Sequence, residues 1–154
     1  MLKSLRRFSA LERTAQTLFL RALIMLPLVA LSLKFRGFEA TRSALRKTLS
    51  HATTQTDSSS LNKRMALTAH MVNAADRHGM VHPTCLVKSL TLWWLLGRQG
   101  ITSELRVGVR KQVGNLEAHS WVEREGLALN EPEERHRHYA AFDAALASLP
   151  EEKR

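Results

Sequence analysis

Cysteine is almost absent from this 154-residue chain, which contains only Cys85. One cysteine cannot form an intramolecular disulfide or a Cys-rich zinc site, so disulfide scaffolds and zinc ribbons are excluded. A chain of this length buries roughly 68–70% of the surface that its unfolded form exposes, so it needs neither to hold a core. A lone cysteine is either a small buried hydrophobe or a nucleophile, and the surrounding sequence must decide between them.

Acidic residues are scarce in the N-terminal third. The net charge is +9, but residues 1–60 carry ten basic and three acidic side chains, whereas residues 61–154 carry thirteen and eleven. This imbalance indicates an acidic partner, an anionic membrane surface or a solvated basic face. We do not expect nucleic acid, because the aromatic residues of this third are all phenylalanine and it has no zinc-finger or RNA-binding signature.

A long uninterrupted apolar run is also missing. Arg21 and Pro27 interrupt the apolar stretch Leu18–Leu33, and the remaining apolar part is shorter than the ~18–20 residues that cross a bilayer. No small-x-small cleavage site follows, as a signal peptide would require. We expect a buried or membrane-apposed helix kinked near Pro27, and a further helical segment over Phe38–Leu49. The expected location is cytoplasmic, with membrane association possible through residues 1–49.

Composition divides the chain into three expected regions. Residues 1–49 form a helical, basic region, residues 50–60 a polar linker and residues 61–154 the core. Ser60 is placed to cap a helix with apolar residues at helical spacing, and Gly79 is placed to end it.

The core region combines a buried helix with alternating strands. The segment from Cys85 to Gly100 is apolar on all sides, which is typical of a helix buried inside a domain. Apolar and polar residues then alternate over Leu105–Arg110 and Ala118–Arg124, and a third strand is expected at Leu127–Asn130. The order predicts an α+β domain with an antiparallel sheet.

Cys85 is the strongest candidate for chemistry. Thr84 is a good N-cap, so Cys85 falls in the first turn of the buried helix, where unpaired N–H groups and the helix dipole favour a thiolate. His119 is the only histidine embedded in a strand pattern. A base there can lie across from the helix N-terminus, as in papain-like and transglutaminase-like folds. Asn130 or Glu131 on the next strand could fix the imidazole tautomer.

A metal site is the competing interpretation of the histidines. His78, His82 and Cys85 are closely spaced, and His136 and His138 could complete a site. Because Gly79 and Pro83 break helical spacing there, we favour the cysteine–histidine pair and expect no metal.

Three segments together resemble a known family. They are CLVKSLTLWWLLGRQGI, ELRVGVRK and EAHSWVEREGLALNE, and the resemblance covers about residues 82 to 131 in detail. They are similar to the transglutaminase-like leader peptidases of bacterial lasso-peptide biosynthesis. The resemblance implies a papain-like or transglutaminase-like core in which Cys85 is the nucleophile and His119 the general base and acid. It places the third catalytic member at Glu131, where the family usually has aspartate.

The resemblance also implies the reaction and the partners. The protein would remove the leader of a ribosomally made lasso-peptide precursor and so free the core amine for macrolactam formation by a separate ATP-dependent cyclase. A leader-binding recognition protein would be a further partner. No cofactor is expected, since the chain has no P-loop of its own. A non-catalytic membrane-associated adaptor, or acyl transfer to an amine, is the alternative function.

The turn at Glu125-Gly126 decides which side chain faces His119. A two-residue turn pairs Arg124 with Leu127 and places Asn130 on the face of His119. A three-residue loop with a glycine bulge puts His119 opposite Glu131. Glycine as the last loop residue favours the second geometry, so we expect Glu131 to orient His119.

Overall fold

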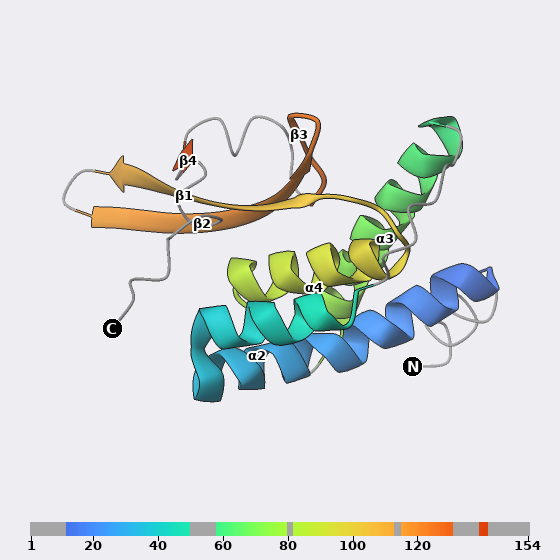
Figure 1. Cartoon of the computed structure of the whole chain (residues 1–154), viewed down its shortest axis with the longest axis horizontal. Coiled ribbons are helices and arrows are strands. Elements are labelled where there is room, and N and C mark those ends of the chain that lie inside the picture. Colours follow the sequence, from blue (N-terminus) through green and yellow to red (C-terminus); the bar gives the residue numbers. More distant parts are fainter. Residues whose placement is uncertain (1–11, 50–57, 80–81, 113–114, 131–138, 142–154) are drawn as a thin grey trace.

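The computed structural model describes residues 12–49, 58–79, 82–112, 115–130 and 139–141. Within them lie the helices α2 (Arg13–Lys47), α3 (Ser58–His78) and α4 (Cys85–Arg98) and the strands β1 (Glu104–Gln112), β2 (Asn115–Arg124), β3 (Leu127–Ala128) and β4 (Ala140–Ala141). The strands form an antiparallel sheet in the order β3-β2-β1-β4. Figure 1 shows the helices on one side of this sheet, with α4 next to it. The predicted α+β fold is confirmed.

α2 is a helical hairpin rather than one straight rod. The backbone leaves helical dihedrals at Gly37, where φ is 76° and ψ is −179°. The first arm, residues 13–36, and the second arm, residues 38–47, therefore lie side by side (Figure 1). A hydrogen bond of 2.8 Å between the hydroxyls of Ser32 and Thr41 joins them.

The sequence predicts a kink near Pro27, and the departure from helical dihedrals lies at Gly37. Pro27 lies inside α2 and the backbone stays helical there. Its ring removes one backbone donor, but a single lost hydrogen bond on the exposed side of a helix can be tolerated when the other face is packed. Gly37 ends the arm instead, because only glycine adopts a positive φ without steric cost.

One hydrophobic core joins α2 to the rest of the described chain. The first arm contributes residues at helical spacing that are almost fully buried, namely Ala15, Leu18, Ala22, Leu26 and Val29. They pack with buried residues of α3 and α4 and with Val122 of β2. Leu90, Leu92 and Leu96 of α4 have no exposed surface. α4 is therefore the central buried helix.

The ends of α3 and α4 follow local sequence signals, with one exception. α3 ends at His78 directly before Gly79, as predicted, but it begins at Ser58, so Ser60 lies inside the helix rather than capping it. After α4, Gly100 has a φ of 73°, and the N–H of Ile101 donates to the carbonyl oxygen of Leu96 at 3.0 Å. This is the arrangement that a glycine favours at a helix C-terminus.

The β1–β2 hairpin supplies most of the sheet. Its register pairs Leu105 with Val122 and Gly108 with His119. Both strands are longer than the alternating patterns predict. β4 was not expected at all: it is two residues long and pairs with the outer edge of β1.

The predicted register between β2 and β3 is wrong. Arg124 pairs with Leu127, so Glu125 and Gly126 form a two-residue turn. Their φ angles are 51° and 80°, and a positive φ at both central residues defines the type I′ hairpin turn. This turn matches the right-handed twist of the flanking strands, and that match outweighs the cost of a left-handed glutamate.

Candidate active site

Cys85 is the first residue of α4, as predicted. Thr84 has an extended backbone, and its hydroxyl accepts a hydrogen bond from the N–H of Val87 at 3.4 Å, which makes it the N-cap. Cys85 is half-buried. The free backbone N–H groups of a first helical turn and the helix dipole stabilise an anion at this position.

Cys85 and His119 line the same cavity. Its volume is about 220 Å³, and its remaining walls are largely apolar. They are Phe38, Leu86, Val107, Ala118 and Ser120. Phe38 follows the break at Gly37, so the turn of the α2 hairpin reaches this cavity. Both residues that the sequence selected therefore line one cavity, although the continuous register of β2 places the His119 side chain on the opposite side of the strand from Ala118 and Ser120.

Aromatic rings surround the imidazole of His119. The ring is stacked on Trp121 with centroids 6.2 Å apart and an interplanar angle of 19°. The centroid of the Tyr139 ring lies 5.0 Å from that of His119, with an interplanar angle of 35°. His119 and Trp121 share one side of β2, because side chains two residues apart in a strand point to the same side. Tyr139 is buried and comes directly before β4. The unexpected strand β4 therefore positions an aromatic neighbour of His119.

A charged pair adjoins these rings. Arg110 and Glu117 are opposite each other in the β1–β2 register, and Nη2 of Arg110 lies 2.6 Å from Oε2 of Glu117. The guanidinium also lies 4.9 Å from the centroid of Tyr139. The hydrogen bond from Arg110, and to a lesser degree one from Tyr139, holds the pKa of Glu117 below its usual range. Through Arg110, the pair therefore contacts Tyr139, whose ring in turn lies next to that of His119.

Ser89 is a site residue that the sequence analysis missed. It lies one helical turn after Cys85 and is fully buried. Its hydroxyl donates to the carbonyl oxygen of Ser120 at 2.9 Å and accepts from the side-chain amide of Asn130 at 3.2 Å. The signal was a serine inside a largely apolar helix, since a buried hydroxyl requires a partner. Ser89 fixes the first turns of α4 against the strand that carries His119.

Asn130 belongs to this network rather than to His119. Its side-chain oxygen accepts a hydrogen bond of 2.9 Å from the N–H of Val122, where continued strand pairing would supply a backbone carbonyl. Its amide nitrogen donates to Ser89. Asn130 thus ends the β3 pairing and joins the sheet to α4. Glu131 lies outside the described residues.

The histidines of the metal interpretation do not assemble in the described part of the chain. No group of three or more His, Cys, Asp and Glu side chains there could hold a metal ion. His78 and His82 are both exposed. His136 and His138 lie outside the described residues.

A family profile matches most of the chain. The sequence profile described as the Transglutaminase-like superfamily matches residues 24–142, a range that begins inside the first arm of α2 and includes all four described strands. No curated protein and no solved structure matches the chain.

Proposed function

The chain belongs to the transglutaminase-like superfamily, which includes cysteine peptidases and acyltransferases, and we propose that it is a cysteine peptidase. Its proposed substrate is the leader of a ribosomally made lasso-peptide precursor. The substrate class rests on the resemblance of three sequence segments, and the reaction class rests on the site.

One observation carries the proposed reaction: Cys85, at the N-terminus of the buried helix α4, shares a cavity with His119. A cysteine nucleophile needs a base and a stabilised anionic form. The helix N-terminus supports the anionic form, and His119, which lines the same cavity, is the proposed base. The chain holds no second cysteine that could take the role.

The proposed reaction has two steps. His119 takes the thiol proton, the Cys85 sulfur bonds to the carbonyl carbon of the last leader residue, and the amide C–N bond breaks as His119 protonates the departing core amine. Water then attacks the thioester while His119 accepts one of its protons. The carbon–sulfur bond breaks, the thiol is restored, and the leader leaves as a carboxylic acid. The core amine is then available to a separate cyclase.

The remaining roles follow from the site and the resemblance. The apolar wall formed by Phe38, Leu86 and Val107 is suited to an apolar substrate side chain next to the scissile bond. Glu131 is proposed to orient the imidazole of His119, a role that rests on the resemblance alone. A leader-binding protein, the precursor and an ATP-dependent cyclase are the proposed partners.

Reconstitution with precursor and leader-binding protein, followed by mass spectrometry, tests this proposal. Cys85→Ala should abolish leader removal, and His119→Gln should reduce it at least a hundredfold, a typical contribution of a general base. His70→Gln is the matched control, because His70 is exposed on α3 and should retain wild-type turnover. Circular dichroism should show that all three variants are folded.

Three results would contradict the proposal. Unchanged cleavage by a folded Cys85→Ala protein would exclude the peptidase. Incorporation of an added primary amine into the leader in place of water would make the protein an acyltransferase. An alkylation rate of Cys85 by iodoacetamide equal to that of a simple thiol, together with no cleavage, would leave an adaptor function.

A further inference from the structure

The outer side of the first α2 arm is almost entirely apolar. Its large apolar side chains are between 48% and 74% exposed. We call them the outer stripe, and they are Leu20, Ile24, Leu28, Leu31 and Phe35. Their spacing of three and four residues places them along one side of the helix. The opposite side of the same arm is buried in the core. The outer stripe is therefore an exposed surface and not a misplaced part of the core.

Basic residues flank this stripe, and acidic residues are missing from it. The arm carries Arg13 and Arg21 near its start and Lys34 and Arg36 near its end, with no Asp or Glu between Arg13 and Gly37. Among the described residues, no ion pair involves Arg21, Lys34 or Arg36. An apolar helix side bordered by cations is the pattern of helices that lie in the plane of an anionic membrane.

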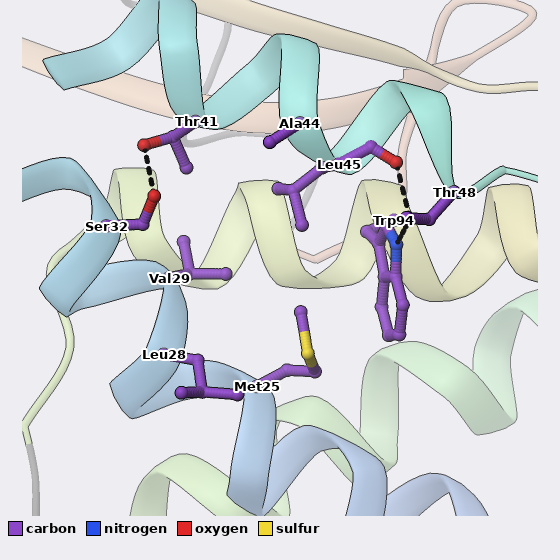
Figure 2. Close-up of a pocket in the computed structure, with 9 residues that line it drawn as sticks. All are labelled: Met25, Leu28, Val29, Ser32, Thr41, Ala44, Leu45, Thr48 and Trp94. Atoms are coloured by element: carbon purple, nitrogen blue, oxygen red, sulfur yellow. Dashed lines mark hydrogen bonds between the residues drawn. The ribbon is translucent and has the colours of Figure 1, made fainter. Parts of the chain in front are cut away.

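A groove beside the stripe extends the apolar surface. The groove lies between the two arms of α2, and Trp94 is one of its lining residues (Figure 2). Its volume is about 300 Å³, and Leu28 of the outer stripe also lines it. Its polar groups are already paired: the hydroxyls of Ser32 and Thr41 bond to each other, and the Trp94 indole N–H donates to the hydroxyl of Thr48, both at 2.8 Å.

These paired groups favour hydrocarbon over a peptide as occupant. A peptide brings backbone N–H and C=O groups that must be hydrogen-bonded when they are buried. An acyl chain brings none, so a groove whose polar groups bond to one another suits it better.

The helix cannot cross the bilayer in this fold, although its length and composition make α2 a candidate span. The charge-free part between Arg21 and Lys34 is 12 residues long. As a helix it is about 18 Å long, which is shorter than the hydrocarbon core of a bilayer, about 30 Å thick. Spanning would also remove Leu18, Ala22 and Leu26 from the core. We propose that the protein binds the surface of an anionic lipid bilayer through the outer stripe, with the first arm of α2 lying parallel to the membrane plane.

Sedimentation of the full chain with lipid vesicles tests the proposal. Wild type should bind vesicles of phosphatidylglycerol and phosphatidylcholine in equal parts, bind phosphatidylcholine alone much more weakly, and lose affinity as salt rises. Ile24→Asp/Phe35→Asp should weaken binding roughly tenfold or more, because two apolar side chains no longer enter the hydrocarbon. Leu127→Asp, a change at a site 57% exposed on β3, is the matched control and should bind as wild type does.

A charge variant completes the test. Arg21→Gln/Lys34→Gln/Arg36→Gln should weaken binding to anionic vesicles and flatten its dependence on salt. Because all these positions are exposed, thermal unfolding should differ little among the variants. No binding by wild type, or equal loss in Leu127→Asp, would overturn the proposal. Salt-independent binding to both vesicle types would also overturn it. So would self-association that Ile24→Asp/Phe35→Asp removes in the absence of lipid binding, since the stripe would then be a contact between two copies.

Discussion

Ser89→Ala isolates the contact between α4 and the sheet. The substitution deletes one hydroxyl and adds no bulk, and alanine is a better helix former than serine. It leaves two groups without this partner, the buried carbonyl oxygen of Ser120 and the partly exposed side-chain amide of Asn130. The change therefore tests the hydrogen bonds rather than the packing.

The expected loss follows from these two groups. A buried polar group left unsatisfied costs about 1–3 kcal/mol, and Asn130 keeps its second bond, to the N–H of Val122. One buried group loses its partner, so we expect Ser89→Ala to lower the free energy of unfolding by about 1–3 kcal/mol. In a domain of this size that corresponds to a fall in Tm of roughly 3–10 °C.

Thermal unfolding followed by circular dichroism measures this effect. Ser43→Ala is the matched control, because Ser43 is exposed on the second arm of α2 and should change the free energy of unfolding by less than about 0.5 kcal/mol. The Ser89→Ala/Asn130→Ala double variant should lose less than the sum of the single variants, because both belong to one network. A Tm for Ser89→Ala equal to that of Ser43→Ala would refute the argument.

Two further predictions concern the hairpin. Glu125→Asn should raise the free energy of unfolding by about 0.5–1 kcal/mol, because asparagine tolerates the left-handed conformation that Glu125 adopts. Urea unfolding measures this change. A lower free energy of unfolding would mean that losing the exposed ion pair with Arg124 costs more than the relief of backbone strain gains. Glu117→Gln should lower Tm at neutral pH but not in acid. The pKa of Glu117 is lowered in the folded protein, chiefly by the hydrogen bond from Arg110. Its contribution to stability is therefore fully present above the ordinary carboxyl pKa and is lost as pH falls from there through the lowered pKa of the folded protein. A Tm difference that persists in acid would contradict this assignment.

Strong local signals account for the parts of the fold that the sequence predicted. Thr84 identified the start of α4, and Gly100 its end, because each satisfies backbone groups that every helix leaves open. The apolar character of α4 indicated burial, and alternation located β1 and β2. The pairing of Cys85 with His119 at one cavity followed from the same elements.

The features that sequence reasoning missed depend on competition between distant or weak effects. Pro27 is the stronger helix breaker by composition, yet the tertiary packing of the first arm preserves the helix and Gly37 reverses the chain. Glycine as the last loop residue favoured the bulged alternative, yet Glu125 adopts the left-handed conformation and the turn has two residues. Tyr139 reaches His119 through a two-residue strand, which is too short to show alternation.

The shared core of α2 and α4 has a consequence for synthesis of the chain. The first arm of α2 leaves the ribosome well before α4, so its inner side, with Leu18, Leu26 and Val29, has no α4 to pack against during that interval. Until α4 emerges, both sides of the arm are apolar and uncovered, and the nascent chain is most prone to aggregate then. A pause in translation before α4 has emerged should therefore lower the yield of folded protein more than a pause after α4 has emerged.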